Sequence, residues 1–256
     1  MKKIINLLLA SAIVSILSTG CSKQKKSEIL VLAAASLKDV FTELKNVYEL
    51  QHEDVSLLFS FASSGALQAQ IEEGAKANLF ISADVKQMKV LQSKGLMEED
   101  SVINLLENKL VLVLPENSSK NINDFASLAS DEVSMIAIGQ PQSVPAGRYA
   151  MEVFDFLGIS EAVKSKANYA MDVRSVLAWV EEGVIDCGLV YQTDALSSKK
   201  VRIAAAAPQG SLRRIIYPVG IVKGGQEPEK AKEFISFLTS GEASKIFTSY
   251  GFSRAE

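Results

Sequence analysis

"VSLLFSFASSGALQAQIEEG", residues 55–74, contains the passage from strand to helix that decides the fold. The part up to Phe61 is almost continuously apolar, as in a strand that is buried on both faces. The part from Ser64 onwards predicts a helix that reaches Glu73. The turn between them has two serines and a glycine but no Lys, Arg or His. It presents hydroxyls and the unpaired N–H groups of a helix start, which raises the question of what these groups bind.

Strand and helix patterns alternate over the rest of the chain. Apolar runs predict strands at 29–34, 55–61, 78–83, 109–114, 133–139, 186–191, 201–206 and 215–222. Helical patterns predict helices over 37–48, 64–73, 84–94, 145–158, 173–183, 228–239 and 241–249. This alternation is typical of an α/β fold with mainly parallel sheets flanked by helices.

The elements fall into two groups, so we expect two lobes. The strands at 109–114 and 215–222 are expected to cross between them. Residues 28–111 and 218–256 would then form lobe 1, and residues 112–217 would form lobe 2. Folds of this kind bind ligands at the carboxyl ends of strands, where helices begin.

The first 27 residues are not expected to join this core. Two lysines precede an uncharged apolar run, Ile4 to Leu17, which is the pattern of an export signal over residues 1–20. The run is shorter than the roughly 20 residues of a spanning helix. Small residues before Cys21 resemble a bacterial lipoprotein signal, in which this cysteine is lipidated and residues 21–27 form a polar tether. We expect an exported protein, lipid-anchored at the cell membrane or periplasmic. An ordinary cleavage site or an uncleaved membrane anchor are the alternatives.

Removal of the leader changes the charge balance. The whole chain carries 27 basic and 30 acidic residues. Five of the lysines and no acid precede Glu28, so the folded part has 22 basic and 30 acidic residues, a net charge of −8. Nucleic-acid binding needs a basic face and is not expected. An anionic ligand would have to be bound by local dipoles rather than by the overall field.

Residues for catalysis or metal binding are few. His52, the only histidine, is expected in a solvated loop, away from any serine nucleophile. One histidine and the thiol of Cys187, which is expected to be buried, cannot complete a zinc site. No GxGxxG or GxxxxGK[ST] motif supports nucleotide binding. Asp84, Asp172 and Asp194 fall near strand-to-helix junctions, where a carboxylate is expected to cap the helix. We therefore expect a protein that is not an enzyme.

The recurrent polar feature is a strand that leads into a helix start through small or hydroxyl residues. Each helix start offers unpaired N–H donors and about half a positive charge. Several such starts around one cleft would make an anion site that needs no full cation. The candidate positions are Ser36, Ser63, Ser64, Ala146, Gly147, Val173 and Tyr191.

Three cations, Lys38, Arg148 and Arg174, lie close to these helix starts. Each stands beside its candidate position or two residues beyond it. The sequence leaves open whether any of them contacts a ligand or points to solvent.

These stretches carry a resemblance to a known family. "LAAASLKDVF" (32–41), "FSFASSGALQAQIEEGAKANLFISAD" (59–84), "VPAGRYA" (144–150), "DVRSVLAWVEEG" (172–183) and "GLVYQTDA" (188–195) resemble, in this order, the molybdate-binding proteins of ABC importers. The likeness runs over residues 29–253. It implies the type II periplasmic-binding-protein fold, with two α/β lobes, two crossing strands and a ligand in the cleft.

The resemblance also implies a site. Ser36 and Ser64 would contribute hydroxyl and N–H donors, Ala146 and Val173 backbone N–H groups, and Tyr191 its phenolic hydroxyl. Molybdenum would be held only as the oxyanion, with no direct protein ligand to the metal and no cofactor. A shell that only donates suits a fully deprotonated dianion.

The expected function follows from this site. The protein would capture molybdate, and tungstate as well, in the cleft between the lobes and deliver it to ABC permease subunits as a monomer. A binding protein for sulfate or another small oxyanion is the alternative. The preference between molybdate and tungstate is left open.

Overall fold

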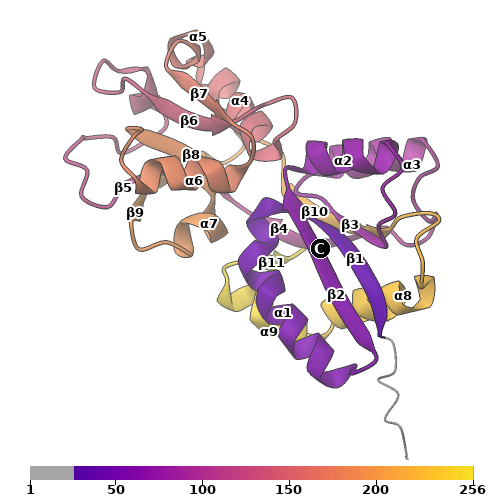
Figure 1. Ribbon diagram of the computed structural model, residues 1–256. Helices are drawn as coiled ribbons and strands as arrows, with labels where there is room; N and C mark the ends of the chain where they lie inside the picture. Colours follow the sequence, from indigo (N-terminus) through magenta and orange to yellow (C-terminus); the bar gives the residue numbers. More distant parts are fainter. Residues whose placement is uncertain (1–25, 256) are drawn as a thin grey trace, which may run out of the picture.

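The computed structural model describes residues 26–255, which form two lobes, each built on one sheet flanked by helices (Figure 1). The expected signal peptide and Cys21 lie outside the described residues. Among the residues that are described, no helix has the length and apolar character needed to cross a bilayer.

The first lobe contains a six-stranded sheet in the order β11-β4-β10-β3-β1-β2. The bounds are β1 (Ser27–Ala34), β2 (Val55–Ala62), β3 (Leu79–Ile81), β4 (Ile103–Asn108), β10 (Ile215–Ile221) and β11 (Ser253–Arg254). Its helices are α1 (Lys38–Gln51), α2 (Ser64–Glu72), α3 (Val85–Ser93), α8 (Pro228–Leu238) and α9 (Gly241–Ser249), and a 3-10 turn, η1 (Ala35–Leu37), precedes α1.

Alternation of side chains along the strands explains why both faces of this sheet are covered. Val31 and Leu79 belong to the core that includes residues of α1, α8 and α9. Their neighbours Leu32 and Phe80 belong to a second cluster with residues of α2 and α3. Successive side chains of a strand point to opposite faces, so a continuous apolar run is what a strand between two helical layers requires.

The second lobe contains a five-stranded sheet in the order β7-β6-β8-β5-β9. The bounds are β5 (Leu110–Pro115), β6 (Ile136–Gly139), β7 (Ala167–Ala170), β8 (Cys187–Tyr191) and β9 (Val201–Ala206). Its helices are α4 (Pro145–Leu157), α5 (Ser160–Lys164), α6 (Val173–Glu181) and α7 (Gln192–Leu196), and a 3-10 turn, η2 (Ala126–Ala129), lies before β6. Cys187 is buried in β8, as expected, and burial raises the pKa of its thiol to about 12.

The predicted α/β architecture of two lobes is confirmed, but the sheets are mixed rather than mainly parallel. β1 pairs in parallel with β2 and β3, and β6 pairs in parallel with β7 and β8. The strands that enter a sheet from the other lobe, β5 and β10, run antiparallel to their neighbours. A chain that enters a sheet from the other lobe arrives from the ligand-facing end, which reverses its direction.

The chain changes sheet at two places. β4 and β5 are separated only by Lys109, so the first crossing is almost a continuous strand. The second crossing lies between β9 and β10, because β10 pairs only with β3 and β4 of the first sheet. These positions differ by a few residues from the boundaries expected after 111 and 217. At the N-terminal end, Ser27, expected in the tether, pairs with Val55 as the first residue of β1.

Several short elements were not predicted: β4, β7, β11, α5 and α7. β4, with the sequence INLLEN, and β7, with the sequence ANYA, lack the long apolar run that marks a strand covered on both faces. These two strands are held by pairing with neighbours that are distant in sequence.

Candidate functional site

A small cavity lies between the lobes and is lined by the starts of several helices. About 10 Å³ is open to the centre of a water-sized sphere, which is close to the room that one water molecule needs. The free space between these helix starts is therefore small. The lining residues are Ala34, Ala35, Ser36, Ala62, Ser63, Ser64, Ala83, Val144, Pro145, Ala146, Asp172, Val173 and Tyr191.

All five predicted ligand contacts line this cavity. Ser36 and Ser64 come from the first lobe, and Ala146, Val173 and Tyr191 come from the second. Each of them is buried. The cavity therefore combines residues that the sequence separates by up to 155 positions, from Ser36 to Tyr191.

The helix starts carry the donors. α2 begins at Ser64, with the Ser63 hydroxyl accepting a hydrogen bond from the Ala66 N–H as an N-cap. α4 begins with Pro145 and α6 begins with Val173, and both N-termini face the cavity. The N–H groups of a first helical turn have no partner within the helix, so Ala146 and Val173 supply donors and the positive end of a helix dipole.

The oxygen of Ser64 is already used as an acceptor. The backbone N–H of Ala83 donates to the Ser64 hydroxyl oxygen over 2.9 Å. This hydrogen bond joins the start of α2 to the end of β3 in the same lobe. The proton of the Ser64 hydroxyl is left to donate elsewhere, and the cavity lies beside it.

Tyr191 brings an unused hydroxyl to the cavity. Its side chain is 1% exposed, and its hydroxyl has no hydrogen-bond partner among the described residues. Burial raises its pKa well above 10, so the group remains a protonated donor. A buried hydroxyl without a partner carries a desolvation penalty that a bound acceptor would remove.

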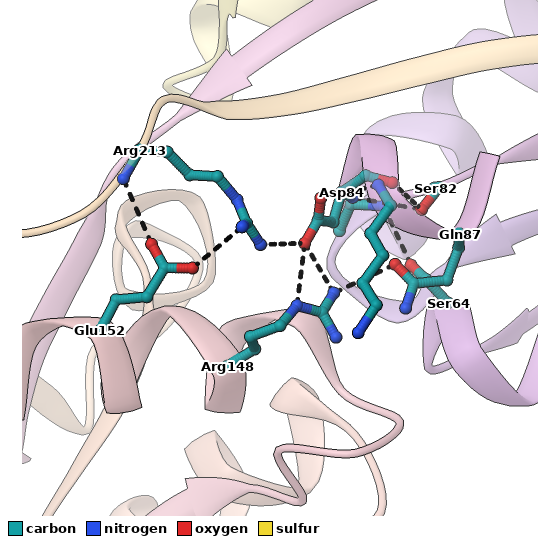
Figure 2. A network of polar contacts seen from close by, with 9 residues as sticks. Ser64, Ser82, Asp84, Gln87, Arg148, Glu152 and Arg213 are labelled. Atoms are coloured by element: carbon teal, nitrogen blue, oxygen red, sulfur yellow. Dashed lines mark hydrogen bonds and ion pairs between the residues drawn. The ribbon is translucent and has the colours of Figure 1, made fainter. Parts of the chain in front are cut away.

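The nearby arginines bind carboxylates and do not line the cavity, and Figure 2 shows this pairing for Arg148 and Arg213. Arg148 donates to Asp84 from Nη2 over 2.6 Å and from Nε over 3.1 Å, and Arg213 donates to the same carboxylate over 2.9 Å. Arg174 pairs with Asp39 and Asp194 at 2.9 and 3.3 Å. The third nearby cation, Lys38, is exposed. As far as the described residues show, the cavity is lined by neutral donors and the Asp172 helix cap.

Two of these ion pairs join the lobes. Arg148 of α4 reaches Asp84 at the start of α3, and Arg174 of α6 reaches Asp39 of α1. The backbone N–H of Gly65, in the first lobe, also donates to the Ser143 carbonyl of the second lobe over 2.9 Å. The structure therefore holds the two lobes in contact around the cavity.

The expected roles of the aspartates are confirmed at two positions and wrong at the third. The carboxylates of Asp84 and Asp172 accept from Lys86 N–H and Ser175 N–H as N-caps. Asp194 lies inside α7 instead, fully buried, with one oxygen paired to Arg174. α7 begins one residue after Tyr191, so Asp194 falls too late in the helix to cap it.

His52 is not a freely solvated loop residue as expected. It ends α1, stacks on the Tyr48 ring with a centroid distance of 4.0 Å, and its Nδ1 lies 3.0 Å from the Tyr48 carbonyl oxygen. The ring thus completes the C-terminus of the helix. No group of three or more His, Cys, Asp or Glu side chains suited to a metal ion occurs within residues 26–255.

The sequence did not reveal the residues behind the site. Tyr217 lies 3.0 Å from the Ser36 hydroxyl, and Asn108 lies 3.3 Å from the Tyr217 hydroxyl. Tyr217 is hidden in an apolar strand run and Asn108 ends the unpredicted strand β4. The one signal in the sequence was the polar hydroxyl of Tyr217 inside an apolar strand, and this signal did not indicate which residue it would bond.

Comparison with known proteins identifies the family. Residues 29–253 match the model of the bacterial extracellular solute-binding proteins. The chain is 41% identical to YvgL of Bacillus subtilis, named as an ABC transporter substrate-binding lipoprotein, over 96% of this chain and 97% of that protein. It is 38% identical to the molybdate-binding protein ModA of Haemophilus influenzae, over 91% and 93% of the two chains.

A solved structure shows the same fold. The periplasmic molybdate-binding protein of Azotobacter vinelandii superposes with a TM-score of 0.81 at 24% identity, over 89% of this chain and all of that one. This superposition agrees with the two-lobed architecture. This chain belongs to the bacterial extracellular solute-binding protein family.

Proposed function

We propose that the protein captures molybdate, and tungstate as well, outside the cytoplasm and delivers it to the permease of an ABC importer. The observation that carries this proposal is the small cavity between the lobes, which is lined by hydroxyl residues and helix starts from both of them. The 38% identity to a molybdate-binding protein over 91% of the chain supports the choice of anion.

The chemistry of the cavity favours a tetrahedral anion without protons. Ser64 and Tyr191 have hydroxyl protons to donate, and the first turns of α4 and α6 add N–H groups. An anion that only accepts hydrogen bonds can satisfy all of them. A protonated phosphate brings a donor that needs an acceptor. The carboxylate of the lining, Asp172, is engaged in capping α6, so this donor would be left unsatisfied at a cost in affinity.

The anion is cargo and not a cofactor, and the protein is proposed to be a carrier and not an enzyme. Within the described residues, the one histidine is engaged with Tyr48 and the arginines near the cavity are engaged with carboxylates. The lipid anchor at Cys21 is part of the same proposal, supported by the lipoprotein name of the Bacillus subtilis relative. Fractionation tests the anchor. The unsubstituted protein should stay with the membrane, and Cys21→Ala should be released into the medium or periplasm.

Calorimetric titration with molybdate, tungstate, sulfate and phosphate tests the choice of anion. We expect binding of molybdate and tungstate at micromolar or lower concentrations, with little competition from excess sulfate. Ser64→Ala should weaken molybdate binding by about 1–3 kcal/mol, since a charge-assisted bond is lost. Ser93→Ala, at an exposed serine outside the cavity lining, is the matched control. Absence of heat with molybdate and tungstate would refute the proposal. Effective competition by sulfate would show instead that the protein binds sulfate or small oxyanions in general.

A further inference from the structure

A chain of hydrogen bonds leads from the first interlobe crossing to the cavity. It begins at Asn108, the last residue of β4, passes through the Tyr217 hydroxyl and ends at the Ser36 hydroxyl. Tyr217 is completely buried in β10, and Ser36 lines the cavity. The direction in which each group donates decides what Ser36 can offer to a ligand.

The orientation of the Asn108 amide is set by its own neighbour. The backbone N–H of Lys109 donates to Oδ1 of Asn108 over 2.8 Å, so this atom must be the carbonyl oxygen. The other end of the amide is therefore the NH₂ group. It donates to Thr193 Oγ1 over 2.9 Å and to the Tyr217 hydroxyl oxygen over 3.3 Å. The two protons of the amide have one partner each.

The amide fixes the direction of the next bond. An amide nitrogen can only donate, so the oxygen of Tyr217 is an acceptor toward Asn108. The hydroxyl of Tyr217 has one proton, and the Ser36 oxygen, 3.0 Å away, is its remaining partner among the described residues. If Ser36 donated instead, the Tyr217 proton would be buried without an acceptor, which is costly.

The last bond of the chain then points into the cavity. Because Ser36 accepts from Tyr217, its own proton is free to donate toward the space between the lobes. We propose that Asn108 and Tyr217 are positioning residues that hold Ser36 as a hydrogen-bond donor and thereby strengthen the selection of oxyanions that carry no proton. This inference rests on the proposed function, because it concerns the same anion.

The Tyr217 phenol in this chain of hydrogen bonds stays protonated. Burial raises the pKa of Tyr217 well above 10, so its proton is present throughout the physiological range. The neighbouring ring of Tyr191 packs edge-on at 5.7 Å between centroids and Phe252 packs on Tyr217 at 5.6 Å. These rings restrict the Tyr217 side chain to the position from which it reaches Ser36.

The arrangement has a parallel at Ser64. There the backbone N–H of Ala83 occupies the serine oxygen, and here the side chain of Tyr217 does so. A backbone donor cannot be removed by substitution, whereas the phenol can. At Ser36, removal of the phenolic oxygen of Tyr217 should therefore change the selectivity of the cavity while the serine itself is kept.

A double-mutant cycle tests the inference. Molybdate affinity is measured by calorimetry for the unsubstituted protein, Tyr217→Phe, Ser36→Ala and the double variant. We expect Tyr217→Phe to weaken molybdate binding about tenfold in the presence of Ser36, the loss typical of one hydrogen bond, and less than about twofold in the Ser36→Ala background. Tyr48→Phe is the control: it also removes a buried phenolic hydroxyl, but one that has no hydrogen-bond partner among the described residues and lies outside the cavity lining, so the affinity should be unchanged.

Selectivity gives a second readout that a merely structural role would not move. In Tyr217→Phe the Ser36 oxygen can accept from a protonated ligand, so the ratio of molybdate to phosphate affinity should fall about tenfold or more. Asn108→Ala, tested in the same cycle, should also lower the ratio of molybdate to phosphate affinity. It replaces Tyr217→Phe in the test if that variant does not fold.

The outcomes separate the two proposals. An equal loss in both backgrounds of the cycle, or an unchanged molybdate-to-phosphate ratio, overturns the positioning role while molybdate binding by the unsubstituted protein stands. Absence of any molybdate binding by the unsubstituted protein refutes the proposed function and removes the basis of the positioning role with it.

Discussion

Gly65→Ala is expected to raise the stability of the ligand-free protein and to lower its affinity for the anion. Gly65 lies in the first turn of α2, and its backbone N–H donates to the Ser143 carbonyl of the other lobe. Alanine is the better helix former by about 0.5–1 kcal/mol, and this gain is available while the lobes are apart. The closed arrangement has no room for the added methyl group.

The size of the clash follows from the structure. A Cβ atom on Gly65 would lie 2.5 Å from the Ser143 carbonyl oxygen and 2.8 Å from its Cα, below the 3.0 Å that such contacts require. Both atoms are backbone, so the lobes must stop at least about 0.5 Å short of full closure. The donors of the two lobes then no longer reach one anion together. The loss of one charge-assisted hydrogen bond costs about 2 kcal/mol of binding free energy, which corresponds to a dissociation constant about 30-fold higher.

Two measurements and one control make the test decisive. Urea unfolding of the ligand-free protein reports stability, and calorimetric titration with molybdate reports affinity. Gly241→Ala is the matched control, because Gly241 also lies in the first turn of a helix with a serine N-cap but has nothing within 4 Å of the added Cβ. An affinity equal to that of the unsubstituted protein would show that the Gly65 contact is not needed in the bound form and would refute the reasoning.

Two further predictions concern buried carboxylates. Asp84→Asn keeps the volume and the cap of α3 but leaves Arg148 and Arg213 without their shared anion; the free energy of unfolding should fall by about 3 kcal/mol, and an unchanged urea midpoint would contradict this. Burial raises the pKa of Asp194 to about 7, from 3.8. The folded state thus binds a proton that the unfolded chain has lost, so this group's contribution to stability is lost as the pH rises from about 4 through 7. Asp194→Asn should flatten the fall in stability between about pH 4 and 7, and an unaltered pH profile would exclude the shift.

Much of the fold could be predicted from local patterns. The apolar runs of β1, β2, β5, β8 and β10 and the stripes of α1, α4 and α6 are visible in the sequence because each is covered by neighbours of a known kind. The antiparallel direction of the crossing strands was missed, because direction depends on which lobe a strand comes from. β4 was missed because its pairing with β10 compensates for a weak pattern of its own.

The site divides in the same way. Ser36, Ser64, Ala146, Val173 and Tyr191 were predicted as ligand contacts from a resemblance together with the recurring helix starts, and the structure places all five around one cavity. Their contact with an anion stays a prediction. The pairing of Arg148 and Arg174 with carboxylates of the opposite lobe was beyond the sequence, since many acidic residues were available as partners.

The sequence by itself determined which residues end strands and begin helices, and therefore where backbone donors are left unpaired. Only the tertiary structure decided in which direction the hydroxyls donate. Ser36 and Tyr217 are separated by 181 positions, and Ser64 meets the Ala83 N–H only where β3 ends beside α2. A hydroxyl can donate or accept with equal ease, so its role is set by the first fixed donor that the fold brings to its oxygen.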